Sequence, residues 1–252
     1  MRLILVLSDI LGVFLKNNSG NILFVILIAV ALFAALTFAI SHSTNVSQNS
    51  TVRETSTING SVLTQYVASI RSTILRMRND GRTIFELQFN APADFGSLTS
   101  QSFGVFHPSG GTVIYQTAPS DLRDIQGDNP TGQWIFTYNF EVSNVGTSVA
   151  GNLNGNDLIA FQVGIKEEVC SQINQRLGLP TLPIPTITNQ SYASDMITST
   201  QSYYVDHDYV LPVSEFVIGA GAGDAALSGQ LEGCYHEDQS DNYVYYGVMI
   251  ER

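Results

Sequence analysis

The chain has 252 residues, which is enough for one sizeable domain with an additional segment or for two small domains. Its 22 acidic and 11 basic residues give a formal net charge of -11. This balance argues against a nucleic-acid-binding surface, because such a surface needs clustered Lys and Arg. The only two cysteines are Cys170 and Cys234. An even count in an exported domain favours one disulfide between them, while two free buried thiols remain the alternative.

The apolar run at residues 22–40 gives the first structural prediction. It contains one polar residue, Thr37, and no charge. A helix of that length covers the roughly 30 Å hydrocarbon core of a bilayer, so the run predicts a transmembrane helix at residues 21–41, with a buried core helix as the alternative. Arg2 and Lys16 precede the run. The positive-inside rule then predicts a single-pass protein of the cytoplasmic membrane, with a cytoplasmic N-terminus and the remainder periplasmic or extracellular.

Small residues repeat along the same run. Ala31, Ala35 and Ala39 are spaced every four residues and would lie on one side of a helix. Small residues at this spacing let two helices approach closely, so these three alanines are candidate helix-packing residues. The alternative is that alanine is simply common in membrane helices.

A family resemblance begins at the residues before the run. Lys16–Gly20, followed by the apolar stretch from Asn21, resembles the N-terminus of type IV pilins and type II secretion pseudopilins. In that family a peptidase cuts after the glycine and the apolar helix becomes the filament core. The resemblance implies processing between Gly20 and Asn21, a prepilin peptidase as partner, and a homo-oligomer or filament built through the N-terminal helix. The family's glutamate at the fifth position after the cut is Val25 here.

A second resemblance covers the C-terminal half, where residues 169–178, 233–237 and 243–252 resemble pilin-like proteins of alphaproteobacterial type. The predicted organisation is a leader or cytoplasmic N-terminus at 1–20, the membrane helix, a polar stalk with an amphipathic helix at 42–81, and an exported head at 82–252. The amphipathic helix is indicated by apolar residues spaced by three or four. These residues are Ile58, Val62, Tyr66, Ile70, Ile74 and Met77.

The head is predicted to contain several strands and a second helix. The helix is expected from Asp157 to Leu177, with Gly178 after it. The expected strands are Thr83–Phe89, Phe103–His107, Thr112–Gln116, Trp134–Val142 and Tyr243–Ile250. The fold class is therefore α+β, with a long N-terminal helix packed on an antiparallel β-sheet head that carries a second helix.

Two motifs invite a chemical interpretation. Gly219 and Gly221 follow an apolar run as in a dinucleotide-binding turn, but Gly229 and Gly233 would interrupt the helix that such a turn needs. Acidic residues with histidine occur at residues 206–208 and 236–241, and oxygen ligands so close together suit Ca²⁺. Glu237, Asp238 and Asp241 are therefore weak calcium candidates, with solvated acidic turns as the alternative. No cofactor and no catalytic residue is otherwise indicated.

The functional hypothesis that follows is a structural subunit of a pilus or pseudopilus-like filament, anchored in the membrane by its N-terminal helix. It is not expected to be an enzyme or to bind nucleic acid. The alternative is a membrane-tethered binding module outside the cytoplasm that does not polymerise. An exported hydrolase is the third hypothesis, and it would require a cleft with converging titratable groups.

Overall fold

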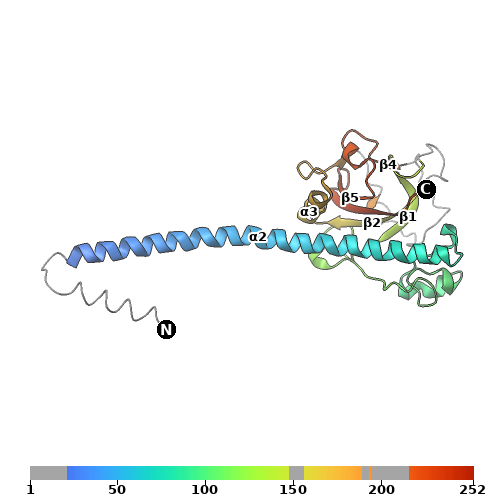
Figure 1. The fold of residues 1–252 in the computed structure, drawn as a ribbon, viewed down its shortest axis with the longest axis horizontal. Helices are drawn as coiled ribbons and strands as arrows, with labels where there is room; N and C mark the ends of the chain where they lie inside the picture. The colour runs from blue at the N-terminus through green and yellow to red at the C-terminus, as the bar shows by residue number, and fades with distance from the viewer. Residues whose placement is uncertain (1–21, 148–155, 189–192, 195–215) are drawn as a thin grey trace. The chain divides into compact units, whose positions relative to one another are not determined.

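The structure is a computed structural model that describes residues 22–147, 156–188, 193–194 and 216–252. It divides into two compact units, Met1–Val52 and Arg53–Arg252. One helix, α2 (Ile22–Asn79), contributes to both units, and the sheet belongs to the second unit (Figure 1). The predicted processing residues Gly20 and Asn21 lie outside the described residues.

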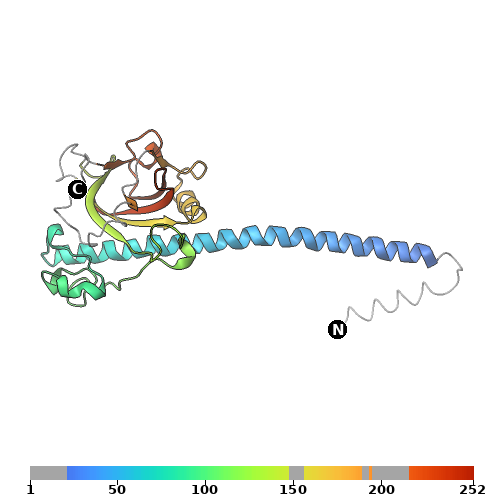
Figure 2. The ribbon, with the colours of Figure 1, turned by 180° about the vertical axis from the view of Figure 1, so that it is seen from behind.

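In the second unit, α2 is amphipathic and lies along one face of the sheet (Figures 1 and 2). Its inward side chains recur every three or four residues and are at most 8% exposed, which confirms the predicted amphipathic pattern from Tyr66 onward. These residues are Leu63, Tyr66, Val67, Ile70, Ile74 and Met77. The helix ends where Gly81 adopts φ +89°, a left-handed conformation that glycine adopts without steric cost.

Six strands form one sheet in the order β3-β5-β6-β2-β1-β4. The pairs β5–β6, β6–β2 and β2–β1 are antiparallel, whereas β1–β4 and β3–β5 are parallel. The strand bounds are β1 Ile135–Val142, β2 Asp157–Ile165, β3 Thr186–Ile187, β4 Phe216–Ile218, β5 Glu232–Glu237 and β6 Asn242–Ile250. The sheet is therefore mixed, and the predicted antiparallel head is wrong. The two parallel strands are only two and three residues long, too short to give a periodic signal in the sequence.

The second helix, α3, runs from Glu167 to Leu177, so the helix predicted from Asp157 is wrong over its first half. Residues 157–165 form β2, and all nine are buried. A strand buried on both faces is a continuous apolar run, which periodicity cannot distinguish from a buried helix. The predicted end is confirmed, since Gly178 is left-handed at φ +74° and its N–H bonds back to the last turn.

Two other strand predictions are confirmed, with ends that differ by one residue: Trp134–Val142 corresponds to β1 and Tyr243–Ile250 to β6. The three strands predicted between residues 83 and 116 are not present. That region consists of irregular turns and short 3₁₀ segments, with one isolated β-bridge between Gln88 and Gly104. The described 3₁₀ segments are Ile84–Glu86, Pro92–Ser97, Gln101–Phe103, Ser120–Leu122 and Ala225–Leu227.

No helix in the described part of the chain is long and apolar enough to cross a membrane. The predicted transmembrane helix at residues 21–41 is therefore wrong. The single-pass localisation with an exported head depended on that helix and is wrong as well.

The sheet has an apolar core on each face. One core lies between the sheet and the helices α2 and α3 and includes the stacked rings of Phe89 and Phe136, 4.5 Å apart. The other core covers the opposite face and includes Phe140, Phe161 and Tyr246. Burial on both faces explains why the central strands β2 and β6 are almost entirely apolar.

Candidate functional site

The most unusual surface is the N-terminal part of α2. Ten large apolar side chains between residues 24 and 38 are 43% to 70% exposed. They are Phe24, Val25, Ile26, Leu27, Ile28, Val30, Leu32, Phe33, Leu36 and Phe38. Consecutive positions on a helix point about 100° apart, so these residues cover every side of it. A helix that is apolar all round is normally buried by a partner, because a contiguous apolar patch of this kind is rare on a monomeric surface.

One side of this segment is hollowed into a shallow groove, here called the α2 groove. Its lining residues recur every three or four positions, so they form a continuous strip along the helix. They are Ile26, Ala29, Val30, Phe33, Ala34 and Thr37. The alanines leave the space, and the larger side chains form its walls. Packed helices insert the side chains of one helix into such a strip on another.

The polar atom at the end of the groove has partners in its own helix. The Thr37 Oγ1 lies 2.8 Å from the carbonyl oxygen of Phe33 and 3.0 Å from that of Ala34. A threonine hydroxyl that bonds back to its own helix can be covered by apolar atoms without losing a hydrogen bond to water. The groove can therefore be buried along its whole length at little polar cost.

The alanines chosen from the sequence do not line this groove. Ala31 and Ala35 are exposed on an adjacent side, and the side chain of Ala39 lies outside the described residues. The small residues that shape the groove are Ala29 and Ala34. Spacing alone could not separate these two sets, because small residues occupy several sides of the same helix.

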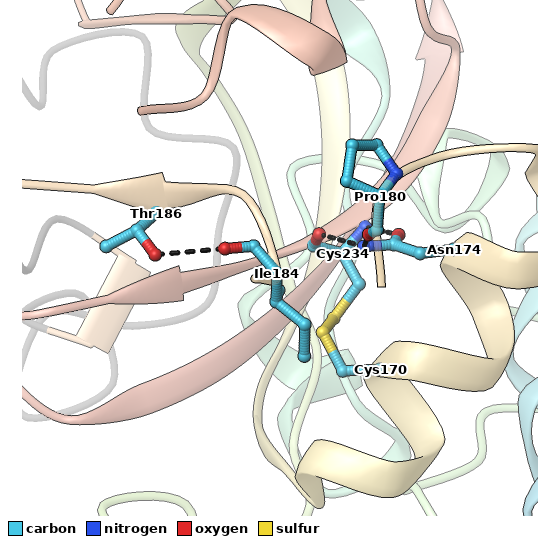
Figure 3. The surroundings of a disulfide bond; sticks show 6 residues. All are labelled: Cys170, Asn174, Pro180, Ile184, Thr186 and Cys234. Atoms are coloured by element: carbon cyan, nitrogen blue, oxygen red, sulfur yellow. Dashed lines mark hydrogen bonds between the residues drawn. A yellow bond between two sulfur atoms is a disulfide. The ribbon is translucent and has the colours of Figure 1, made fainter. Parts of the chain in front are cut away.

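The disulfide between Cys170 and Cys234 is present, with the Cα atoms 5.4 Å apart, which confirms that pairing (Figure 3). Asn174, one turn beyond Cys170 on α3, forms hydrogen bonds with the backbone of Cys234 on β5. Its Oδ1 accepts a hydrogen bond from the Cys234 N–H at 3.0 Å, and its Nδ2 donates to the carbonyls of Cys234 and Pro180 at 2.9 and 3.1 Å. Both cysteines and Asn174 are fully buried, so α3 is joined to β5 by a covalent bond and by an amide.

The weak calcium candidates do not form a metal site, because no three His, Cys, Asp or Glu side chains in the described part of the chain are arranged so that they could hold a metal ion. Glu237 is buried and accepts hydrogen bonds from both Ala193 and Ser194. Asp241 is exposed and lies 3.0 Å from the His236 ring. Residues 206–208 lie outside the described residues.

The glycine-rich segment is a turn rather than a nucleotide-binding loop. The Gly219 N–H donates to the Asp224 carboxylate at 2.7 Å, and a three-residue 3₁₀ turn, Ala225–Leu227, follows. A dinucleotide site requires a full helix whose N-terminus faces the pyrophosphate. The arrangement therefore closes a loop and leaves no cradle for phosphate.

The burial of the carboxyl groups of Asp157 and Glu237 was not predicted from the sequence. Asp157, at the start of β2, accepts N–H bonds from Val142 at 3.0 Å and Arg252 at 3.1 Å. Burial raises the pKa of Asp157 to about 6 despite those bonds, and burial likewise raises the pKa of Glu237. Both groups hold backbone segments in place through these hydrogen bonds.

No family model, no curated protein and no solved structure matches the chain. The resemblance to pilins at residues 16–36 thus has no support beyond the sequence itself. The fold and the site together define a mixed-sheet domain whose longest helix begins with an exposed apolar segment. The function must be argued from that segment.

Proposed function

We propose that the chain is a structural subunit that assembles with copies of itself through residues 24–38 of α2. The observation that supports this proposal is the set of ten exposed apolar side chains on all sides of that segment. Burying one Leu, Ile, Val or Phe side chain contributes about 1.5–3 kcal/mol, so covering several of them in a helical bundle provides a strong driving force. A filament-like assembly, which the resemblance at the N-terminus implies, covers such a helix on every side.

The α2 groove favours another helix of the same kind as the occupant. Its 3–4 spacing matches the ridge-and-groove packing of two helices. Large side chains such as Leu32 and Leu36, on the neighbouring side of one copy, can fill the space over Ala29 and Ala34 of the next. A structural subunit of this kind needs no catalytic centre.

The proposal can be tested by sedimentation velocity on the full-length chain over a range of concentrations. The wild type should form oligomers, and the double variant Val30→Asp/Phe33→Asp should be monomeric, because it places two charges in the groove. Each buried unpaired charge costs several kcal/mol, so association should weaken by at least about 100-fold.

The matched control is Leu182→Asp, which introduces the same charge at an exposed leucine in the second unit. Leu182 is 84% exposed and lies far along the chain from the groove. This variant should associate like the wild type. A wild-type chain that remains monomeric at high concentration, or one that binds lipid vesicles or detergent instead of other copies, would contradict the proposal.

A further inference from the structure

The second unit carries two grooves of opposite charge, one at each end of α3. The acidic groove is lined by five carboxylates and two basic residues, drawn from three separate segments. Its charged residues are Asp121, Arg123, Asp124, Lys166, Glu167, Glu168 and Asp241. The basic groove is lined by Arg71, Arg176 and Glu232, together with small and polar residues. Since α3 has 11 residues, about 16 Å separates its two ends.

The minority charges in each groove are bound to the protein's own atoms. In the acidic groove, Lys166 Nζ donates to the carbonyl of Asp121 at 3.0 Å, and Arg123 Nε donates to the carbonyl of Ala118 at 2.9 Å. In the basic groove, Glu232 accepts a hydrogen bond from the Tyr245 hydroxyl at 3.1 Å. These bonds hold the minority groups in place and leave their charges intact, so the acidic groove carries three more carboxylates than basic residues and the basic groove one more arginine than carboxylates.

The majority charges lack partners of opposite sign in the described part of the chain. Arg71 and Arg176 form no ion pair there; Arg71 donates to the Val248 carbonyl and Arg176 Nη1 to the Ser61 hydroxyl at 2.7 Å. None of the five carboxylates forms an ion pair with Lys or Arg, and Asp241 pairs with His236. The dipole of α3 accounts for acidic residues in its first turn and Arg176 in its last. It does not account for Arg71 from α2 or for the aspartates of the two loops.

We infer that the basic groove receives the acidic groove of a second copy, so that successive copies join in a head-to-tail contact along α3. This inference rests on the self-assembly proposed above and adds a second, charged contact between the sheet domains. The chain's net charge of -11 makes it a poor match for an acidic partner except at this basic groove. A contact between two different surfaces of one chain leaves both surfaces available on the outer copies, so it joins successive copies into rings or open rows. In this contact the arginines of the basic groove pair with the carboxylates of the acidic groove, and such guanidinium–carboxylate pairs are strong and directional.

Charge-swap variants of the full chain test this inference. One variant carries Arg176→Glu, and the other carries Glu167→Lys/Glu168→Lys; all three side chains are exposed, so the fold should be retained. Each variant alone has like charges at both ends of α3, and its association should fall by at least about tenfold. An equal mixture of the two should recover wild-type association, since each now supplies the groove that the other needs. Wild-type association should also weaken as salt rises.

The control is Arg78→Glu, an exposed arginine of α2 outside both grooves, which should behave like the wild type. Melting curves of every variant verify that it is folded. Unchanged association in both charge variants, or a mixture no better than its components, overturns the inference. If the Val30→Asp/Phe33→Asp variant is nevertheless monomeric, the proposed function stands and only the head-to-tail contact fails. If the wild type is monomeric, both fail.

Discussion

The two parts of α2 differ in how their apolar side chains are distributed and covered. From Leu63 to Met77 the helix is apolar on one side, and that side is covered by the sheet of its own chain. From Phe24 to Phe38 the helix is apolar on all sides and is exposed. A helix that is covered by its own chain needs only an apolar stripe, and the proposed assembly explains why the other segment is apolar on all sides. Folding accounts for the first segment, and the proposed association accounts for the second.

The strongest test of this comparison is to replace an isoleucine with aspartate in each of the two segments of α2. Ile74 is fully buried, so Ile74→Asp should place an unpaired charge in the core and lower the free energy of unfolding by more than about 4 kcal/mol. Ile28 is 43% exposed, so Ile28→Asp should leave the melting temperature of the second unit unchanged and weaken self-association. Urea titrations and sedimentation velocity on both variants measure the two effects. Equal destabilisation by the two changes would contradict the comparison.

The disulfide should matter for folding and have no direct role in association. Cys170 and Cys234 are separated by 64 positions, and a loop of that size gives a chain-entropy stabilisation of up to about 4 kcal/mol. The double variant Cys170→Ala/Cys234→Ala should lose much of this stability in thermal unfolding. Below its melting temperature the variant should still form oligomers. Loss of association from a folded Cys-free chain would show that the two parts of the molecule are not independent.

A smaller effect is expected from the amide beside the disulfide. Replacing Asn174 with leucine leaves the Cys234 N–H and two carbonyl groups without their partner, at a cost of about 1–3 kcal/mol. The control is Gln175→Leu, because the adjacent Gln175 is exposed. Denaturant unfolding should show a clear loss for the first variant and little change for the second. A neutral Asn174→Leu substitution would mean that the disulfide alone positions α3 on β5.

The smallest predicted effect is a dependence of stability on pH. The pKa of Asp157 is about 6 in the folded chain against an ordinary value of 3.8, because burial disfavours the charged form. The folded state then binds a proton that the unfolded state has released, so the contribution is fully present below about pH 4 and is lost as the pH rises through 6. Between pH 5 and pH 8 the domain should lose on the order of 1 kcal/mol from this group.

Urea unfolding at these two pH values measures that loss, and the Asp157→Asn variant should show a smaller one. The raised pKa of Glu237 acts in the same direction, so Glu237→Gln should also reduce the pH dependence. Stability that instead rises with pH in the wild type would contradict both assignments. Association through the apolar segment of α2 should be the same at both pH values, because none of its ten exposed apolar side chains titrates.

Sequence patterns predicted those features whose cause is local. The amphipathic side of α2 from Tyr66 onward, the presence of the strand β1, and Gly178 after α3 each depend on a few neighbouring residues. The position of β2 was not predictable in this way, because the helix predicted from Asp157 to Leu177 began with the apolar residues of a strand that is buried on both faces. The short parallel strands β3 and β4 depend on partners far along the chain.

The features of the candidate site also fall into those that the sequence could predict and those that it could not. The apolar composition of residues 22–40 was evident from the sequence, but its interpretation as a membrane span was wrong. The two charged grooves at the ends of α3 became visible only in three dimensions, because their residues come from separate segments. Asn174 also gave no signal, since one buried amide within a helix resembles any exposed polar residue in the sequence.

The place of β6 in the sheet has a consequence for synthesis on the ribosome. β6 is formed by residues 242–250, yet it lies between β5 and β2 and pairs with both. Until this segment has been made, β2 and β5 each present an unpaired edge, and the ring of Tyr245 is missing from the contact with Trp134. Folding of the sheet therefore waits until residue 250 has been made, and the edges of β2 and β5 stay exposed on the nascent chain until then. A chain that also carries an exposed apolar helix should depend on chaperones during that interval.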